Sequence, residues 1–95
     1  MNNDNFGERL KNLRLELDLL QSEFGEIIGE RLGTKRISTS AVGSYERNER
    51  EPACFLLREF ADFFGVSIDY LLCHSNERMT VKNTLERIRL SLAMG

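Results

Sequence analysis

The sequence lacks any long hydrophobic run. In 95 residues, no apolar stretch approaches the roughly 18 residues that a membrane span needs. The polar start, residues 1–4, has neither the basic nor the apolar region of a secretory signal peptide. We therefore expect a cytoplasmic protein that does not associate with membranes.

Cysteine and histidine are scarce. Cys54 and Cys73 are the only cysteines, and they do not have the spacing of a metal site, so we expect free thiols. His74, the only histidine, together with Cys73 is too little for the four ligands of structural zinc. Apart from His74, no residue could readily serve as the base that nucleophilic catalysis needs. The sequence predicts no metal, no cofactor and no enzymatic activity.

Proline is nearly absent too, and the residues that fill the chain favour helices. Pro52 is the only proline in a sequence rich in leucine, glutamate, arginine and isoleucine. Apolar residues recur at intervals of three and four, as one face of an α-helix requires, and no strand pattern is found. The length allows one core and a tail. We expect an all-α fold.

The pattern predicts a five-helix domain over residues 1–74 and a helical segment over residues 75–95. Asn5 with Glu8, and later Ser38, are typical helix N-terminal caps, and Gly65 is a typical stop. The expected helices are residues 5–18, 21–32, 38–45, 52–64 and 67–72. Their expected inward residues are Phe6, Leu10, Leu13, Leu17, Phe24, Ile27, Ile28, Leu32, Ala41, Val42, Tyr45, Leu57, Phe60, Ala61, Phe64, Ile68, Leu71 and Leu72.

Residues 75–95 carry an apolar stripe of their own. Thr80 can cap a sixth helix with Val81, Leu85, Ile88 and Leu92 along one side. Because a helix of about 15 residues is marginal alone in water, the stripe needs a surface to cover it. That surface is either the chain's own domain or a second subunit. Of the two, we assign these four residues to dimerisation.

The charge balance lacks the basic excess of many DNA-binding proteins. Thirteen basic residues stand against 15 acidic ones, for a net charge of −2. The charges are polarised along the chain, so a basic middle segment can face a polyanion. The basic residues of segment 31–50 are Arg31, Lys35, Arg36, Arg47 and Arg50, against Glu46 and Glu49. Segment 51–70 has Arg58 against Glu51, Glu59, Asp62 and Asp69.

A series of motifs follows a fixed order along the chain. The series runs FGERLKNLR, Gln21, Gly25, Val42, Tyr45, Glu46, Pro52 and FADFFGVSIDYLL. This order resembles the phage repressor and Cro family of Xre-like helix-turn-helix regulators, over about Phe6 to Leu72. The resemblance implies a lambda-repressor-like, five-helix DNA-binding domain. It also implies that a homodimer binds a two-fold operator in double-stranded DNA through a recognition helix at residues 38–45.

Particular residues take roles in this interpretation. The outward face of the recognition helix matches the family's base-facing positions, which are Thr39, Ser40, Gly43 and Ser44. The residues expected to face phosphates are Gln21, Lys35, Arg36, Arg47, Asn48 and Arg50. For Lys35 and Arg36, simple solvation is an equal alternative. Arg14 and Glu46 match positions that form a structural pair in relatives.

Two features depart from the family pattern. The stretch from Gln21 to Tyr45 is seven residues longer than usual, with the excess near ERLGTKR. Either the turn lies at Gly29 and residues 30–36 form an insertion, or the second helix continues to about Leu32 and Gly33 stops it. We favour the longer helix. Leu20 stands where a Ser or Thr cap is usual, which should cost the helix roughly 1 kcal/mol unless it is capped otherwise.

Two other functions remain open. Leu15, Phe55 and Phe63 are expected to face outward, and exposed apolar groups mark protein contacts. An antitoxin that neutralises a partner toxin and regulates its own promoter is therefore the alternative to a repressor. The negative net charge also agrees with a family member that has lost DNA binding.

Overall fold

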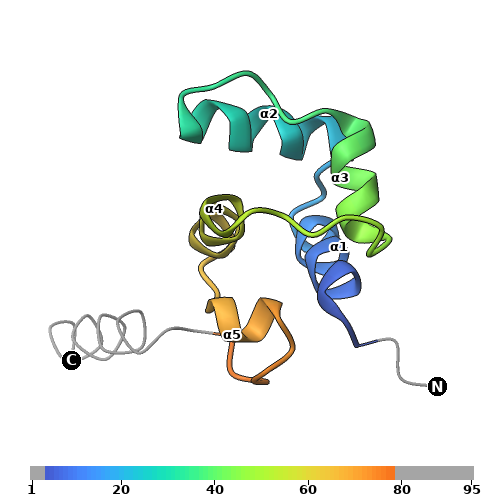
Figure 1. Cartoon of the computed structure of the whole chain (residues 1–95), viewed down its shortest axis with the longest axis vertical. Coiled ribbons are helices and arrows are strands. Elements are labelled where there is room, and N and C mark those ends of the chain that lie inside the picture. The colour runs from blue at the N-terminus through green and yellow to red at the C-terminus, as the bar shows by residue number, and fades with distance from the viewer. Residues whose placement is uncertain (1–3, 79–95) are drawn as a thin grey trace, which may run out of the picture.

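Residues 4–78 are described by the computed structural model, and they form five helices arranged about a shared apolar core (Figure 1). The helices are α1 (Phe6–Glu16), α2 (Gln21–Leu32), α3 (Thr39–Glu46), α4 (Cys54–Phe64) and α5 (Ile68–Leu71). This range contains no strand, so the all-α, five-helix prediction is confirmed. The predicted sixth helix, with Val81, Leu85, Ile88 and Leu92, lies outside the described residues.

Short-range signals in the sequence set most helix boundaries. The side chain of Asn5 accepts a hydrogen bond from the Glu8 amide (3.0 Å), and Ser38 Oγ accepts one from the Ala41 amide (3.1 Å). Gly33 and Gly65 follow α2 and α4 in the left-handed conformation, with φ of 68° and 67°. The preferred reading, a second helix that reaches Leu32 and stops at Gly33, is confirmed.

Two boundaries differ from expectation by two residues, and the others by no more than one. α1 ends at Glu16 instead of residue 18, because Asp18 has φ of 55° and the Leu19 amide turns back to the Arg14 carbonyl (3.2 Å). As a result Leu17, expected in the core, is exposed. α4 begins two residues after Pro52, since its first backbone hydrogen bonds run to the Ala53 carbonyl.

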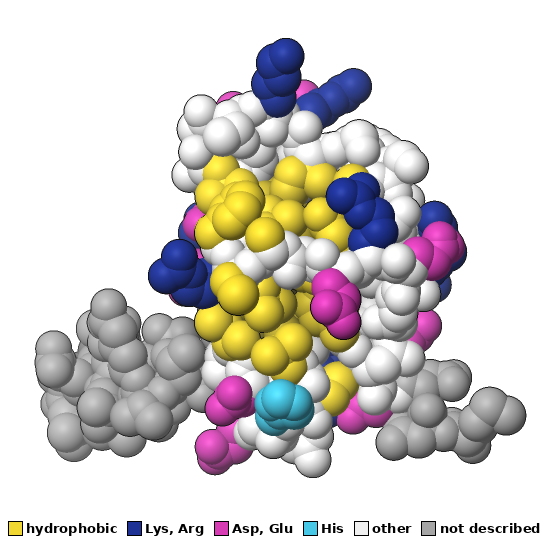
Figure 2. Space-filling view, viewed as in Figure 1, with side chains coloured by type: hydrophobic (Ala, Val, Ile, Leu, Met, Phe, Trp, Pro, Cys, Tyr) yellow, Lys and Arg dark blue, Asp and Glu magenta, His cyan; other side chains and the backbone are white. Residues whose placement is uncertain are grey.

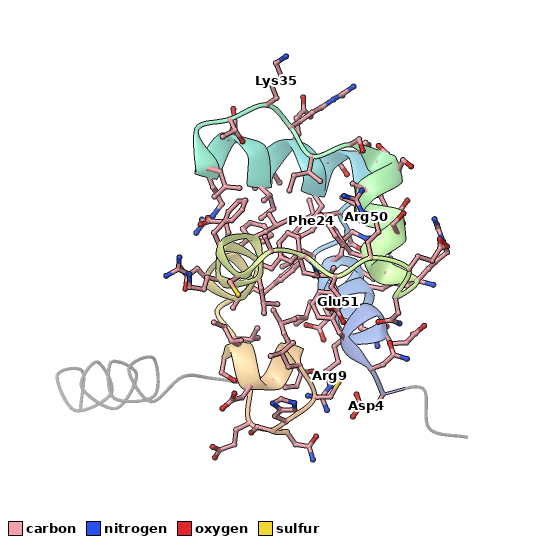
Figure 3. The ribbon with its side chains drawn as sticks, viewed as in Figure 1. Asp4, Arg9, Phe24, Lys35, Arg50 and Glu51 are labelled. Atoms are coloured by element: carbon pink, nitrogen blue, oxygen red, sulfur yellow. The ribbon has the colours of Figure 1, made fainter. Side chains whose placement is uncertain are left out.

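Phe24 of α2 lies at the centre of the core (Figure 3). Its ring is 5.3 Å from those of Phe60 and Phe64 and 5.9 Å from that of Phe63, measured between centroids. Phe63 is therefore partly buried, and the expectation that it faces outward was wrong. Leu56 is buried and Leu57 only half-buried, so the inward face of α4 is rotated slightly from the predicted one. The fully buried large side chains are Leu10, Phe24, Ile28, Val42, Phe60 and Leu71.

Arg9, near the start of α1, forms hydrogen bonds with α5 and with the chain that follows it (Figure 3). Its guanidinium is buried, with only 6% of the residue exposed, and lies 4.3 Å from the ring centre of Tyr70. It donates to both carboxylate oxygens of Asp4 (2.6 Å each), to the carbonyls of Tyr70 (2.6 Å) and Ser75 (2.7 Å), and to Asn76 Oδ1 (2.9 Å). Ser75 and Asn76 are therefore hydrogen-bonded to the five-helix unit, although the predicted domain ended at residue 74.

Candidate nucleic-acid interface

α3 is anchored on one side and open on the other. It packs against α1 and α2 through the buried side chains of Val42 and Tyr45. On the opposite side, Thr39 and Ser40 are exposed and Ser44 is half-buried. A short helix held in this way presents its polar face to the outside, as a helix that enters a DNA groove must.

Gly43, expected to face bases with them, is buried. A Cβ at this position would stand 2.9 Å from Arg47 Nη1 and 3.7 Å from Gln21 Nε2. Gly43 thus lies beneath these two side chains and gives them room. The base-facing roles of Thr39, Ser40, Gly43 and Ser44 stay predictions.

Glu46, the last residue of α3, is the centre of a buried polar network. Arg14 Nε and Nη2 donate to its two carboxylate oxygens (2.7 and 3.0 Å), and Gln21 Nε2 donates to one of them (3.0 Å). Arg14 Nη1 also donates to the Leu19 carbonyl (2.6 Å). Arg14 and Glu46 are 7% and 6% exposed, so this network joins α1, α2 and α3 away from solvent.

The loop after α3 holds three residues expected at phosphates, and two of them form side-chain hydrogen bonds within the protein. Arg47 Nε donates to Glu49 Oε1 (2.6 Å), and this hydrogen bond raises the pKa of Arg47 and lowers that of Glu49. Asn48 has φ of 61°; its Oδ1 accepts from the Gly7 amide (3.0 Å) and its Nδ2 donates to Asn5 Oδ1 (2.7 Å). The arginine is thus paired on the surface, while the asparagine joins the loop to the start of α1.

Arg50 is the third of these residues. Its guanidinium lies 5.6 Å from the ring centre of Tyr45. The side chain is exposed, and no carboxylate partner is found for it within residues 4–78. It can therefore accept a phosphate partner without giving up an ion pair.

A polar hollow of about 420 Å³ brings several of these side chains together beside α3. Its lining also includes Lys11 of α1, an exposed cation to which the sequence analysis gave no DNA-binding role. Nothing in the sequence near Lys11 indicates this role, because its proximity to the loop after α3 arises only from the packing of α1 against α3. The hollow is lined by Glu8, Lys11, Arg14, Gln21, Gly43, Glu46, Arg47 and Asn48.

Lys35 and Arg36 lie apart from this hollow, in the stretch that joins α2 to α3. Lys35 projects from the end of the molecule that is uppermost in Figures 2 and 3, where Lys and Arg side chains stand out. Both residues are exposed. The structure therefore divides the expected phosphate-facing residues between two places, one beside α1 and one beyond α2.

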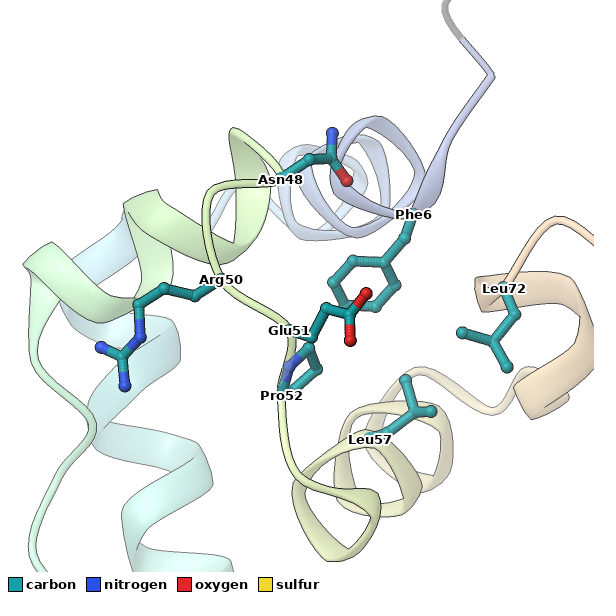
Figure 4. Close-up of a pocket in the computed structure, with 7 residues that line it drawn as sticks. All are labelled: Phe6, Asn48, Arg50, Glu51, Pro52, Leu57 and Leu72. Carbon is teal, nitrogen blue, oxygen red and sulfur yellow. The ribbon is translucent and has the colours of Figure 1, made fainter.

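A second hollow, of about 310 Å³, has an apolar floor (Figure 4). Leu72, expected to close the core, stands at its edge and is exposed, because α5 ends at Leu71. Phe55 of α4 is 57% exposed and Leu15 of α1 is 49% exposed, as predicted for both. The lining residues of the hollow are Phe6, Asn48, Arg50, Glu51, Pro52, Leu57 and Leu72.

Residues 4–78 contain neither a membrane-spanning helix nor a cluster of metal ligands. None of the helices described is long and apolar enough to cross a membrane. No cluster of three or more His, Cys, Asp or Glu side chains in this range is arranged to hold a metal ion.

Comparisons with known proteins give two positive findings. Residues 10–71 match the family model described as helix-turn-helix. Among solved structures, the chain is similar to the P22 c2 repressor in complex with a synthetic operator in the presence of thallium, with a TM-score of 0.56 and 29% sequence identity. That match covers 72% of this chain and 92% of the other. Curated protein sequences give no match.

Proposed function

The chain belongs to the helix-turn-helix family of DNA-binding transcription regulators, and we propose that it is a repressor that reads its operator with α3. The observation that carries the proposal is the anchoring of α3. Its inner face is buried and its last residue is fixed by Arg14 and Gln21, while Thr39 and Ser40 are exposed. The likeness to a repressor bound to its operator supports it.

In this proposal α3 reads bases with short side chains. Thr39, Ser40 and Ser44 offer hydroxyl groups, and the Thr39 methyl can contact a thymine methyl. None of them can make the two-pronged hydrogen bonds that arginine makes to guanine. Sequence preference therefore also depends on the shape and deformability of the operator.

Gln21, Arg47, Asn48 and Arg50 contact phosphates in the same complex. Gln21 Nε2 carries two hydrogens, so it can donate one to Glu46 and keep the other for a phosphate oxygen. Arg47 must exchange Glu49 for the phosphate or share its donors between the two. These contacts give register and affinity, not sequence preference.

The repressor acts as a homodimer on a two-fold operator. Two recognition helices about 34 Å apart would enter successive major grooves on one side of the duplex. The stripe Val81, Leu85, Ile88 and Leu92 is our proposed dimer contact, because a short amphipathic helix needs a partner surface.

Selection of binding sites from random duplex DNA, repeated at several salt concentrations, tests the proposal. We expect Thr39→Ala and Ser44→Ala to change the preferred sequence. We expect Arg50→Ala to weaken all duplexes alike and to lower the log-log salt slope by about 0.9, the value for one lost phosphate contact. If both hydroxyl variants select the wild-type site and Arg50→Ala keeps the slope, α3 is not the DNA-reading face.

A second candidate, an antitoxin that binds a partner protein, is favoured by the exposed side chains of Phe55 and Leu15. Exposed apolar groups of this size mark protein contacts. An adjacent reading frame for a small toxin would favour this candidate. Co-expression should then yield a stable complex that Phe55→Ser disrupts while operator binding is unchanged.

A further inference from the structure

The stretch between α2 and α3 packs directly against two glycines of α2, Gly25 and Gly29. We call residues 33–37 the return segment, because they run back along α2. The Thr34 amide donates to the Gly29 carbonyl and the Ile37 amide to the Gly25 carbonyl (3.0 Å each). A Cβ on Gly29 would stand 2.5 Å from Arg36 Cα, and one on Gly25 would overlap the Ile37 carbonyl. The glycines thus let the segment lie directly against the helix.

In this arrangement Lys35 and Arg36 form no ion pair with a carboxylate in the described part of the chain. Within residues 4–78, the ion pairs are Arg9–Asp4, Arg14–Glu46, Arg31–Glu59, Arg47–Glu49 and Arg78–Glu16. Arg47, the phosphate residue nearest the C-terminal end of α3, therefore has its charge offset by Glu49. The exposed cations of the return segment form no ion pair in this range, so they are free to pair with a phosphate.

The return segment also lies close to the part of α3 that reads DNA. Arg36 is three residues before Thr39, and Ser38 has extended dihedrals, with φ of −64° and ψ of 151°. At no more than about 3.6 Å per extended residue, the two Cα atoms are at most about 11 Å apart. The major groove is about 12 Å wide, so a long cationic side chain at this distance reaches the phosphates along the groove edge when α3 lies inside.

We propose that the return segment is a second DNA-contact element, in which Lys35 and Arg36 hold phosphates at the edge of the site that α3 reads. Gly25 and Gly29 are positioning residues for this element. The inference rests on the proposed function, and it extends the operator contact beyond the recognition helix. It also ranks the cations: the pair in the return segment contributes more to the salt dependence than Arg47, whose charge Glu49 offsets.

The test compares the Lys35→Ala/Arg36→Ala double variant with Arg58→Ala on selected operator DNA. Arg58 is the matched control, since it is exposed on α4 and has no carboxylate partner in the described part of the chain. The double variant should lower the log-log salt slope by about 1.8, at 0.9 per contact. Arg47→Ala should lower it by less than half as much, and Arg58→Ala should leave it unchanged.

Hydroxyl-radical footprinting gives the second readout. The double variant should lose protection of the phosphates at the groove edge while keeping the same selected sequence. Gly29→Ala, which retains both cations, should lose the same protection because the new methyl group displaces Arg36. Thermal melting of this variant shows whether it has folded. Lys35 and Arg36 are exposed, so the double variant remains decisive even if Gly29→Ala does not fold.

The possible failures can be told apart. If the wild-type protein shows no salt-sensitive binding to any duplex, the proposed function is wrong. If the wild type binds but the double variant keeps its slope and footprint, only the return-segment proposal is wrong. A changed base preference in the double variant would also overturn the proposal, because phosphate contacts carry no sequence information.

Discussion

At the scale of single residues, the position of α3 depends on charged groups that are shielded from water. Arg14 and Glu46 form a two-pronged pair, and both side chains are more than nine-tenths buried. Removing one member of such a pair leaves the other charge buried without compensation, which typically costs about 3–5 kcal/mol. Loss of either member of the pair should therefore destabilise the packing of α3 against α1.

We predict that Arg14→Ala lowers the free energy of unfolding by about 3 kcal/mol or more, a fall in Tm of more than about 10 °C for a domain of this size. Lys11→Ala, on the same helix and exposed, is the control and should change Tm by only a few degrees. Calorimetry or circular dichroism measures both. Similar melting temperatures for the two variants would show that the pair does not anchor α3.

Arg9 lies on the same helix but is not a surface residue, although nothing in its local sequence shows this. It is buried, and its partner Asp4 has a lowered pKa because Arg9 donates two hydrogen bonds to the carboxylate. The pair stabilises the fold above the ordinary carboxyl pKa of 3.8, and this contribution is lost as the pH falls through the lower folded-state value.

We predict that Asp4→Asn melts below the wild-type protein at about pH 7 and that the difference shrinks as the pH falls below the ordinary carboxyl pKa of 3.8. The side chain of Asp4 is 42% exposed, so solvent screens the pair and the difference should be modest. Thermal melts of both proteins across this range measure it. A difference that stays constant with pH would mean that the charge of Asp4 does not matter.

At the scale of elements, α2 begins without the usual side-chain cap. Leu20 precedes it, 65% exposed, and has no side-chain acceptor for the free amides of the first turn. Glu23 partly compensates, because its Oε1 accepts a hydrogen bond from the Leu20 amide (2.8 Å). The loss of helix stability expected from the missing Ser or Thr cap is therefore only partly offset by Glu23.

We predict that Leu20→Ser stabilises the protein by about 0.5–1 kcal/mol, because serine can accept a hydrogen bond from the Glu23 amide and little apolar burial is lost. Leu17→Ser, which makes the same exchange at another exposed leucine outside an N-cap position, is the control. Denaturant unfolding compares the two. Equal midpoints would mean that Glu23 alone already satisfies this helix start.

At the scale of the whole molecule, residues 75–78 belong with the five helices. Ser67 donates to the carbonyls of Glu77 (3.3 Å, from Oγ) and Arg78 (2.6 Å, from its amide), and Arg78 pairs with Glu16 (2.8 Å). A truncation intended to remove only the C-terminal stripe must therefore keep Arg78. Cutting at Glu77 would also break contacts to α1 and α5.

We predict that residues 1–78 alone form a folded monomer with much weaker operator binding than the full chain. Loss of the stripe removes the proposed dimer contact, so each half-site is bound independently. Sedimentation equilibrium and operator titration of both proteins test this. A truncated chain that remains dimeric would place the interface elsewhere, with the exposed Phe55 and Leu72 as the next residues to change.

The sequence by itself determined the class of fold and the location of α3, the helix proposed to read DNA. These depend on short-range features, such as apolar residues three and four apart, the cap at Ser38 and the stop at Gly33. Such features act within one or two helical turns, so they can be recognised without knowing what lies nearby in space. Boundaries shifted by about two residues where a turn, as at Asp18, decided them.

Apart from the Arg14–Glu46 pair, which the family resemblance implied, only the tertiary structure decided which polar side chains are buried and with which partners. Arg9 bonds to residues 61 and 66 positions away, and Asn48 caps α1 from 41 positions away, so no local pattern reveals either. The same holds for Phe63, which looks outward on an isolated α4 but packs against Phe24. Whether a side chain is buried depends on the partners and packing surfaces that distant segments provide, and these are set only when the helices pack together.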